Sequence, residues 1–385
     1  MLYPYKIDAK TGKSVFVVLS GKHPPAREPS AEAMPEYALC PDPVPLLPTQ
    51  EAVATVVRKM SGSAGLLGPD SEHLKDMCMR HGVASERLRD SIAALTGWVA
   101  NEHVPWAAIR ALRACRLAAL DKQPGVRPVG IGETISRLMS KVVLYLCGFQ
   151  ATDSASNFNL CAGLPAGIEG AVHAMRVQTQ RGNPEQGCQP QSETPGDKGV
   201  AGSGDDQSEE PLLQHHESEG AQSVEDEPLL DEPITQPEGD DLADLTPMVG
   251  QVSLRDCKDD DPDVACLVDA RNGFNELNRK AMLWHVRHRW PMGARYAFNC
   301  YRYAAQLVVR RPQTAGYVVL SREGVTQGCP LAMLLYGLAL SSLAEELRAA
   351  VPGVVQPWYA DDAAMAGRAS EVSSLMEALT RLGPK

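Results

Sequence analysis

The sequence predicts an α+β fold, in which helices and antiparallel strands form separate segments of the chain. Three observations lead to this prediction. Apolar residues recur at helical spacing through residues 49–115, two short apolar runs flank a polar turn between residues 117 and 131, and short apolar runs alternate with helical patterns after residue 263. The 385 residues suffice for two or three domains, and the 44% share of hydrophobic residues excludes a wholly disordered or membrane-embedded chain.

The first two segments of the chain differ in pattern. Residues 1–48 are rich in proline and lack sustained periodicity, which predicts an irregular leader. Residues 49–115 have a helical pattern, in which Ser85 is placed to cap one helix and Pro105 to open another. The apolar residues of the first of these helices are Leu88, Ile92, Leu95 and Val99. We expect these helices to support the rest of the fold.

The period of the apolar residues changes at Arg116. Apolar runs at residues 117–120 and 126–131 enclose the polar segment 121–125, which is typical of a β-hairpin, and the loop and its flanks are basic. Residues 134–146 then carry apolar side chains on one helical face. The sequence therefore predicts a hairpin followed by a helix.

Residues 183–263 form a strongly acidic segment with no aromatic residue. They contain 23 acidic and three basic residues, a net charge of −20, whereas the rest of the chain has 34 basic and 25 acidic residues, a net charge of +9. Such a composition cannot bury enough apolar surface to offset chain entropy, so we expect a disordered insertion. The basic remainder is compatible with a polyanionic partner such as nucleic acid.

Several classes of protein are disfavoured. The ten cysteines include no Cys-x-x-Cys pair and no histidine at metal-ligand spacing, which argues against a zinc site. The N-terminus lacks the apolar core of a secretory signal, and the longest apolar run, residues 330–343, is shorter than the roughly 20 residues of a membrane span. We therefore expect an intracellular protein, nuclear or cytoplasmic, that is not secreted and has no membrane partner.

The segment after residue 263 alternates strands and helices. The expected elements are a buried strand at 264–268 that ends on Asp269, helices at 276–288 and 293–309, a strand at 317–320, a helix opened by Pro330, and a hairpin at 354–367 whose turn contains Asp361 and Asp362.

Three carboxylates stand at the ends of these expected strands. Asp269, Asp361 and Asp362 would repel one another if they converged, unless they were protonated or bound to cations. Oxygen ligands without His or Cys suit Mg²⁺, and paired Mg²⁺ ions are what in-line nucleotidyl transfer requires. An Asp-Asp pair alone is more often an ordinary turn. The order and spacing of the flanking motifs therefore decide between these interpretations.

Four short motifs occur in order along the chain: Gly125-Val126-Arg127-Pro128-Val129, Asp269-x-x-x-x-Phe274, Gln327-Gly328-x-Pro330 and Tyr359-Ala360-Asp361-Asp362. They resemble the fingers motif and the three catalytic palm motifs of the reverse transcriptases, most closely those of non-LTR retrotransposons. Residues 159–172 resemble the segment that leads into the palm. The resemblance spans roughly residues 110–182 and 264–385. One departure is Cys329, where the family often has Asp.

The resemblance implies a right-hand polymerase architecture. Residues 116–182 would be the fingers, 183–263 an insertion, and 264–385 a palm with an antiparallel sheet packed on helices. It further implies that the chain stops at Lys385 within the fourth palm motif, so that the palm is incomplete and the thumb is absent.

The same resemblance assigns the catalytic roles. Asp269 and Asp361 would be metal ligands with Asp362 as a weaker one, and the carbonyl of Ala270 would face a metal. The cofactor would be two Mg²⁺ ions, which Mn²⁺ could replace. Tyr359 would pack beside the primer end.

Five further residues would contact the nucleotide. Phe274 would lie under the ribose, where its ring excludes a 2′-hydroxyl and selects deoxynucleotides. Arg127 and Lys122 would pair with the triphosphate. Gln327 and Gly328 would form a turn against the nucleotide and the template, where a missing Cβ allows close approach.

The expected function is therefore that of an RNA-directed DNA polymerase acting on an RNA template, a DNA primer and deoxynucleoside triphosphates. Three of these residues also have simpler interpretations. Phe274 could be a core residue, Lys122 a solvated turn lysine, and Gly328 a turn glycine without a ligand. An RNA-dependent RNA polymerase is disfavoured, because it would need a hydrogen-bonding residue in place of Phe274. The alternative from another class is a non-catalytic nucleic-acid-binding remnant of a mobile element.

Overall fold

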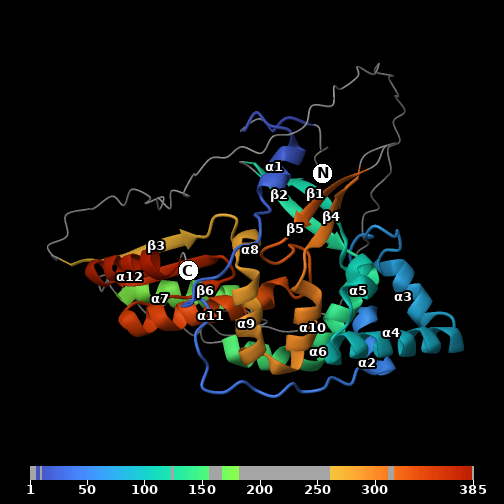
Figure 1. The fold of residues 1–385 in the computed structure, drawn as a ribbon. Coiled ribbons are helices and arrows are strands. Elements are labelled where there is room, and N and C mark those ends of the chain that lie inside the picture. Colours follow the sequence, from blue (N-terminus) through green and yellow to red (C-terminus); the bar gives the residue numbers. More distant parts are fainter. Residues whose placement is uncertain are drawn as a thin grey trace, which may run out of the picture. The chain divides into compact units, whose positions relative to one another are not determined.

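The computed structural model describes residues 6–8, 11–122, 125–155, 167–181, 261–310 and 316–383 in the numbering of the full chain. Within these residues the chain forms twelve helices, a mixed sheet of four strands and an antiparallel sheet of three strands (Figure 1). The predicted α+β class is thus confirmed. The predicted acidic insertion lies outside the described residues except for its last three positions, and so does the predicted motif at 159–166. No helix in the described ranges is long and apolar enough to cross a membrane.

The leader contains a short helix that its sequence pattern does not predict. Helix α1 (Val15–Gly21) begins after Ser14, whose hydroxyl accepts a hydrogen bond from the backbone N–H of Val17 at 3.4 Å. Val15 and Leu19 are buried in a small core shared with the four-stranded sheet. Further along the leader, Leu46 is buried in the main core. The leader is therefore packed onto the rest of the fold.

Residues 49–115 form four helices, as their pattern predicts. These are α2 (Gln50–Arg58), α3 (Ser71–Met79), α4 (Val83–Asn101) and α5 (Trp106–Arg113). The side chains of Thr49 and Asp70 cap α2 and α3. The prediction that Ser85 caps a helix is wrong, because α4 already begins after Gly82, which has a φ of 49°. The buried hydroxyl of Ser85 instead donates to a backbone carbonyl of α3 at 2.7 Å.

The four-stranded sheet contains the predicted hairpin. Its strands are β1 (Cys115–Asp121), β2 (Val126–Gly132), β4 (Ala305–Val309) and β5 (Tyr317–Ser321), in the order β2-β1-β4-β5. The two hairpins are antiparallel, whereas β1 runs parallel to β4 and pairs Cys115 with Leu307. The single helix predicted at 293–309 is wrong: α10 ends at Tyr301, and Ala305, Leu307 and Val309 form the buried side of a strand in which Gln306 and Val308 are less buried.

The remaining helices are α6 (Thr134–Ala155), α7 (Gly167–Arg181), α8 (Gly273–Glu276), α9 (Arg279–Arg289), α10 (Pro291–Tyr301), α11 (Ala332–Ala350) and α12 (Ala369–Leu382). Among them, α6, α9, α10 and α11 contribute buried residues to the main core. The helix predicted at 276–288 is interrupted, because Asn278 caps α9 by accepting hydrogen bonds from two backbone N–H groups at 3.0 Å. The largest fully buried side chains include Trp290, Tyr296 and Tyr301, where α9 and α10 meet the core.

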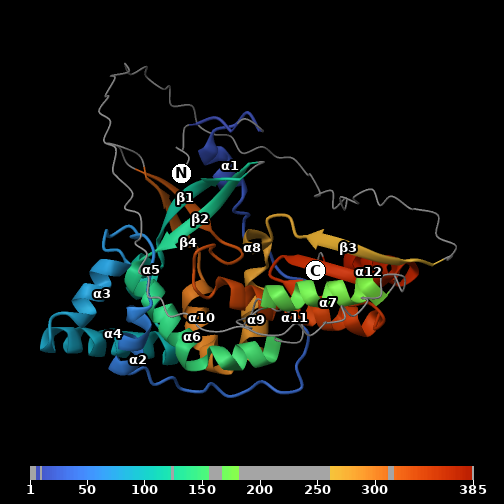
Figure 2. The ribbon, with the colours of Figure 1, turned by 180° about the vertical axis from the view of Figure 1, so that it is seen from behind.

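The three-stranded sheet consists of β3 (Asp263–Asp269), β7 (Asp362–Arg368) and β6 (Trp358–Tyr359), in the order β3-β7-β6. Val264, Cys266 and Val268 pack into a core with α11 and α12. The prediction of a buried strand here is wrong, since β3 is an edge strand whose Leu267 is 81% exposed. Figure 2 shows α7 beside this sheet, and α7 contacts all three of its strands.

Candidate active site

The pairing of β3 with β7 brings the three predicted carboxylates to one end of the three-stranded sheet. Asp269 and Asp362 are directly opposite each other in the antiparallel register. The backbone N–H of Ala270 donates to the carbonyl of Asp361 at 3.1 Å, which extends this pairing into the turn. Ala360 adopts a left-handed φ of 55°, and this conformation lets β6 turn into β7. Backbone geometry therefore fixes the acidic residues together.

The electrostatics of Asp361 report on its surroundings. Burial raises the pKa of the half-buried Asp361 carboxyl, and the negative charges of Asp362 and Asp269 raise it further. Its own backbone N–H and the positive charge of Arg127 oppose that rise in pKa. Arg127 is an exposed residue of β2 in the other sheet. The positive charge of Arg127 is thus near enough to Asp361 to influence the pKa of its carboxyl.

The donor chemistry at this end of the sheet suits a hard divalent cation, because carboxylate oxygens are the ligands that Mg²⁺ prefers. A cation would also offset the repulsion that raises the pKa of Asp361. However, among the described residues, no three Asp, Glu, His or Cys side chains are close enough together to hold a metal ion. The carboxylates therefore share a location without forming a finished three-ligand cluster.

A tight contact supports the turn that contains Asp361. A Cβ at Gly273 would lie 2.6 Å from the hydroxyl oxygen of Tyr336 and 3.0 Å from the Cβ of Asp361. Only glycine allows this approach of α8 to both residues. The ring of Phe274 stacks on the ring of Tyr336, with the ring centroids 4.8 Å apart and the ring planes inclined by 26°. Phe274 is half-buried and packs against the main core, so its ring is both a core contact and a neighbour of the carboxylates.

The loop after β5 is bonded to the segment that follows Asp269. The backbone N–H of Val325 donates to the carbonyl of Phe274 at 2.7 Å, and that of Gly324 donates to the carbonyl of Leu277 at 2.8 Å. Gly324 has a φ of 64°, and a Cβ there would collide with the carbonyl oxygen of Phe274. The first and second predicted palm motifs are therefore joined through their backbones.

Gln327 and Gly328 contact the hairpin. The backbone N–H of Gly130 in β2 donates to the carbonyl of Gln327 at 2.8 Å. Gly328 has a φ of 101°, and a Cβ there would lie 2.6 Å from the carbonyl oxygen of Gly130. The missing Cβ of Gly328 thus makes room for a neighbouring strand, which is the structural role that the sequence left open as an alternative.

Three other predicted positions have simpler surroundings. Lys122 is exposed at the turn of the hairpin, where its backbone N–H donates to the carbonyl of Gly125 at 2.9 Å. Tyr359 pairs with Asp362 in the register of β6 and β7 and is half-buried against the main core. Cys329 is half-buried, and Nη2 of Arg113 lies 4.0 Å from its Sγ.

Sequence reasoning missed a buried pair of charged residues beside this site. Both oxygens of the Glu323 carboxylate accept backbone N–H groups at 2.6 Å, one from Arg27 in the leader and one from Arg279. The Arg279 guanidinium donates to the carbonyls of Ser321, Glu323 and Gly324 at 2.8–3.0 Å. Burial lowers the pKa of Arg279 to about 10. The one signal in the sequence is that Glu323 lies four residues before Gln327, the first residue of the second palm motif.

Asn272 and the leader complete the support of α8. Asn272 has a left-handed φ of 55°, and its side-chain amide donates to the carbonyl of Lys22 at 2.9 Å. Arg27 donates to the carbonyl of Glu276 at 2.7 Å and forms an ion pair with the same residue at 3.0 Å. The leader therefore holds the turn that follows Asp269, a role that its irregular sequence pattern does not indicate.

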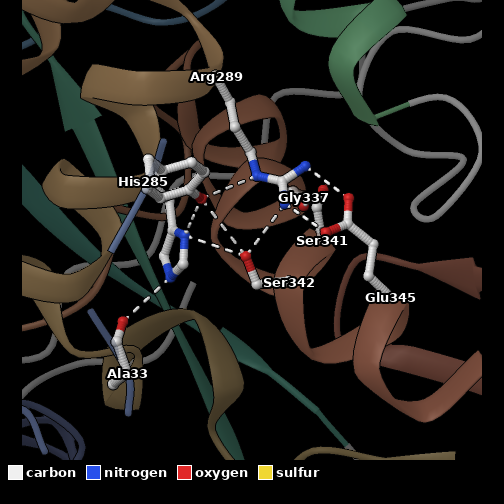
Figure 3. A network of polar contacts seen from close by, with 8 residues as sticks. Ala33, His285, Arg289, Gly337, Ser341, Ser342 and Glu345 are labelled. Atoms are coloured by element: carbon white, nitrogen blue, oxygen red, sulfur yellow. Dashed lines mark hydrogen bonds and ion pairs between the residues drawn. The ribbon is translucent and has the colours of Figure 1, made fainter. Parts of the chain in front are cut away.

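A second network fastens the leader farther along α9 and α11. Arg289 donates to both oxygens of Glu345 at 2.7 and 2.6 Å, and Ser342 lies within hydrogen-bond distance of His285 and Arg289 (Figure 3). His285 Nε2 bonds the carbonyl of Ala33, so this ring is attached to the leader. Burial, aided by the positive charge of Arg289, lowers the pKa of His285 to about 4. The imidazole is therefore neutral at pH 7 and serves as a structural anchor.

Two comparisons with known proteins find no relative of this chain. No protein-family model matches it, and a search of curated proteins finds no significant match.

Proposed function

We propose that this chain is an RNA-directed DNA polymerase domain of the retrotransposon type, which adds deoxynucleotides to a primer 3′-hydroxyl on an RNA template. The observation that carries the proposal is the register that sets Asp269 opposite Asp362 and bonds Ala270 to Asp361. Two motifs that lie about ninety residues apart in sequence are thereby joined at one end of a sheet. The positive charge of Arg127 acts on Asp361, and a positive group there suits a triphosphate.

In this proposal the chain's own residues bind and orient the reactants. The carboxylates of Asp269 and Asp361 would hold two Mg²⁺ ions, with Asp362 as a weaker ligand and the carbonyl of Ala270 nearby. When bound, these ions supply the positive charge that nucleotidyl transfer needs at the attacking and leaving oxygens. Arg127 orients the triphosphate through charge-assisted hydrogen bonds, and Lys122 at the hairpin turn contributes a second positive charge. Gln327 and Gly328 border the template side, and Tyr359 borders the primer end.

The test compares the carboxylates proposed to bind the metal with a carboxylate at the opposite end of β3. Asp361→Asn and Asp269→Asn should abolish both Mn²⁺ binding, measured by electron paramagnetic resonance, and addition of one deoxynucleotide to a primer on RNA. Asp263→Asn is the matched control, because Asp263 lies at the opposite end of β3 beside Arg368. If all three variants retained Mn²⁺ binding and nucleotide addition, the assignment of the site would be wrong.

Nucleotide selection offers a separate test. Phe274→Val should increase ribonucleotide incorporation, because a smaller side chain leaves room for the 2′-hydroxyl. The measurement is the ratio of kcat/KM for a deoxynucleotide and the matching ribonucleotide. An unchanged ratio would return Phe274 to the role of a core residue stacked on Tyr336.

The second candidate function is a non-catalytic nucleic-acid-binding domain. It is favoured by the absence, among the described residues, of a finished group of three metal ligands. Under this alternative the wild-type chain would bind RNA in a salt-dependent manner, but neither Mn²⁺ binding nor nucleotide addition would depend on Asp361.

A further inference from the structure

A cleft of about 260 Å³ lies on a part of the fold that the proposed active site does not use. Its walls come from the leader and from helices α9 and α10. Pro43, Leu283, Ala294 and Phe298 provide apolar surface, and Arg287 and Arg295 provide two guanidinium groups. No acidic residue lines this cleft in the described part of the chain.

The two arginines differ from other arginines of the same helices. Arg289 donates to both oxygens of Glu345, and Arg279 is fully engaged by backbone carbonyls. By contrast, Nη1 of Arg287 is buried and has no hydrogen-bond partner. Arg295 lies over the ring of Phe298, 5.9 Å from its centroid, and forms no ion pair with a described carboxylate. A buried guanidinium nitrogen without a partner is costly, so an anion in the cleft would stabilise Arg287, and Arg295 lines the same cleft and can contact the same anion.

A simpler explanation is that these arginines only interact favourably with the helix dipoles. Arg287 lies in the last turn of α9, where a cation is favourable. Arg295 does not fit that account, since it lies in the middle of α10, outside the last turn where a cation is favoured. The dipole of the helix therefore explains at most one of the two.

The wider charge pattern also favours an anionic ligand. Residues 277–322 contain nine Arg and Lys residues and no Asp or Glu. The cleft lies within this segment, and the leader contributes only Pro43 to it. The positive potential at the cleft is thus not cancelled by its own chain segment.

We propose that this cleft binds the phosphate of a nucleotide unit, with Arg287 and Arg295 on the phosphate and Phe298 beside the sugar or base. The phosphate can belong to a free nucleotide or to a nucleic-acid backbone. Both sources present the same chemistry, a phosphate oxygen that accepts charge-assisted hydrogen bonds from guanidinium groups. The site requires neither the carboxylates nor a metal, so it is independent of the proposed catalysis.

The experiment uses the full chain and two probes, a fluorescent 12-nucleotide RNA and fluorescent dATP, without divalent metal. Arg287→Gln combined with Arg295→Gln should weaken binding of the probe that occupies the cleft by about tenfold or more. If that probe is RNA, the slope of log K against log salt should fall by about 1.4, since each phosphate contact on a single strand contributes about 0.7. The double variant with Lys at both positions should retain most of the slope.

Lys280→Gln is the matched control, because Lys280 belongs to the same basic segment but is paired with Glu28. It should change neither affinity by more than about twofold. An effect on dATP alone would assign the cleft to free nucleotides, and an effect on RNA would assign it to the backbone. If neither probe binds the wild-type chain, or if both bind the folded Gln variant as tightly as the wild type, the inference is overturned. The proposed function is judged separately by Mn²⁺ binding at Asp361, so the two can fail independently.

Discussion

Two groups of charged residues lie at opposite ends of the short segment from Asp269 to Arg279, and they are arranged in opposite ways. At one end, Asp269, Asp361 and Asp362 share a location, and burial together with the like charges of its two neighbours raises the pKa of Asp361. At the other end, Arg279 and Glu323 are buried and nearly every polar atom has a partner. The satisfied group holds the chain in place, whereas the unsatisfied group has free capacity for a ligand. A site that binds cations needs both, since repelling carboxylates must be held together by something else.

The largest effect on stability should come from the satisfied group. Arg279→Met removes the donors to several buried carbonyls and should lower the free energy of unfolding by about 3–5 kcal/mol. Urea denaturation measures this change. Lys280→Met is the control, because it removes only an exposed ion pair and should cost less than about 1 kcal/mol. Equal effects at the two positions would remove the contrast between the groups.

The pH dependence of stability should show the anchoring of the leader. The pKa of His285 is lowered from 6.5 to about 4 in the folded chain, so the unfolded chain binds the extra proton more readily between these pH values. Stability from the neutral imidazole is present above pH 6.5 and is lost as the pH falls toward 4, by about 3 kcal/mol in total. His285→Phe should flatten this part of the curve of unfolding free energy against pH. A slope that is the same in both proteins would contradict the assignment.

The contact between the hairpin and the loop after β5 can be tested at Gly328. Gly328→Ala should destabilise the fold by about 1–3 kcal/mol, because the backbone φ of 101° is strained for alanine and the added Cβ meets the carbonyl of Gly130. Gly170→Ala is the control, since nothing lies within 4 Å of a Cβ at that helical position. Thermal denaturation of the two variants should separate them clearly, and a neutral Gly328→Ala would show that the hairpin can move away.

The smallest effect is expected at the unsatisfied group. The pKa of Asp361 is raised in the folded chain, so ionisation of this carboxyl disfavours folding, and stability falls as the pH rises through the folded pKa. Asp361→Asn should therefore stabilise the metal-free chain at pH 7, by less than about 1 kcal/mol because the half-exposed charge is screened by solvent. The gain should disappear near pH 4. A loss of stability instead would mean that the carboxylate supports the fold.

Local sequence patterns predicted the helices and strands that are determined by residues close together in the sequence. The hairpin of β1 and β2 and the strands next to Asp269 and Asp362 follow from short apolar runs with turn residues at their ends, whereas the pairing of β3 with β7 joins distant parts of the sequence. The strand at Ala305–Val309 was mistaken for helix because its mostly apolar residues, four of the five, suit either structure. Its pairing with β1, far away in sequence, decides between the two.

The support of the site could not be predicted in the same way. Arg279 and Glu323 look like surface charges in the sequence, and only the fold buries both against backbone groups. The role of the leader has the same origin, since its bonds to Asn272 and Glu276 join residues about 250 positions apart. Exposure of β3 was missed because its apolar run does not reveal that the strand lies at the edge of its sheet.

The contact between α7 and β3 has a consequence for how much chain the fold can tolerate between these two elements. Residues 182–260 connect them in sequence, so the contact closes a loop. The entropy lost on closing a flexible loop grows only with the logarithm of its length, by about 0.6 kcal/mol for each doubling. Halving the length of this connection should therefore change the free energy of folding by only about 0.6 kcal/mol.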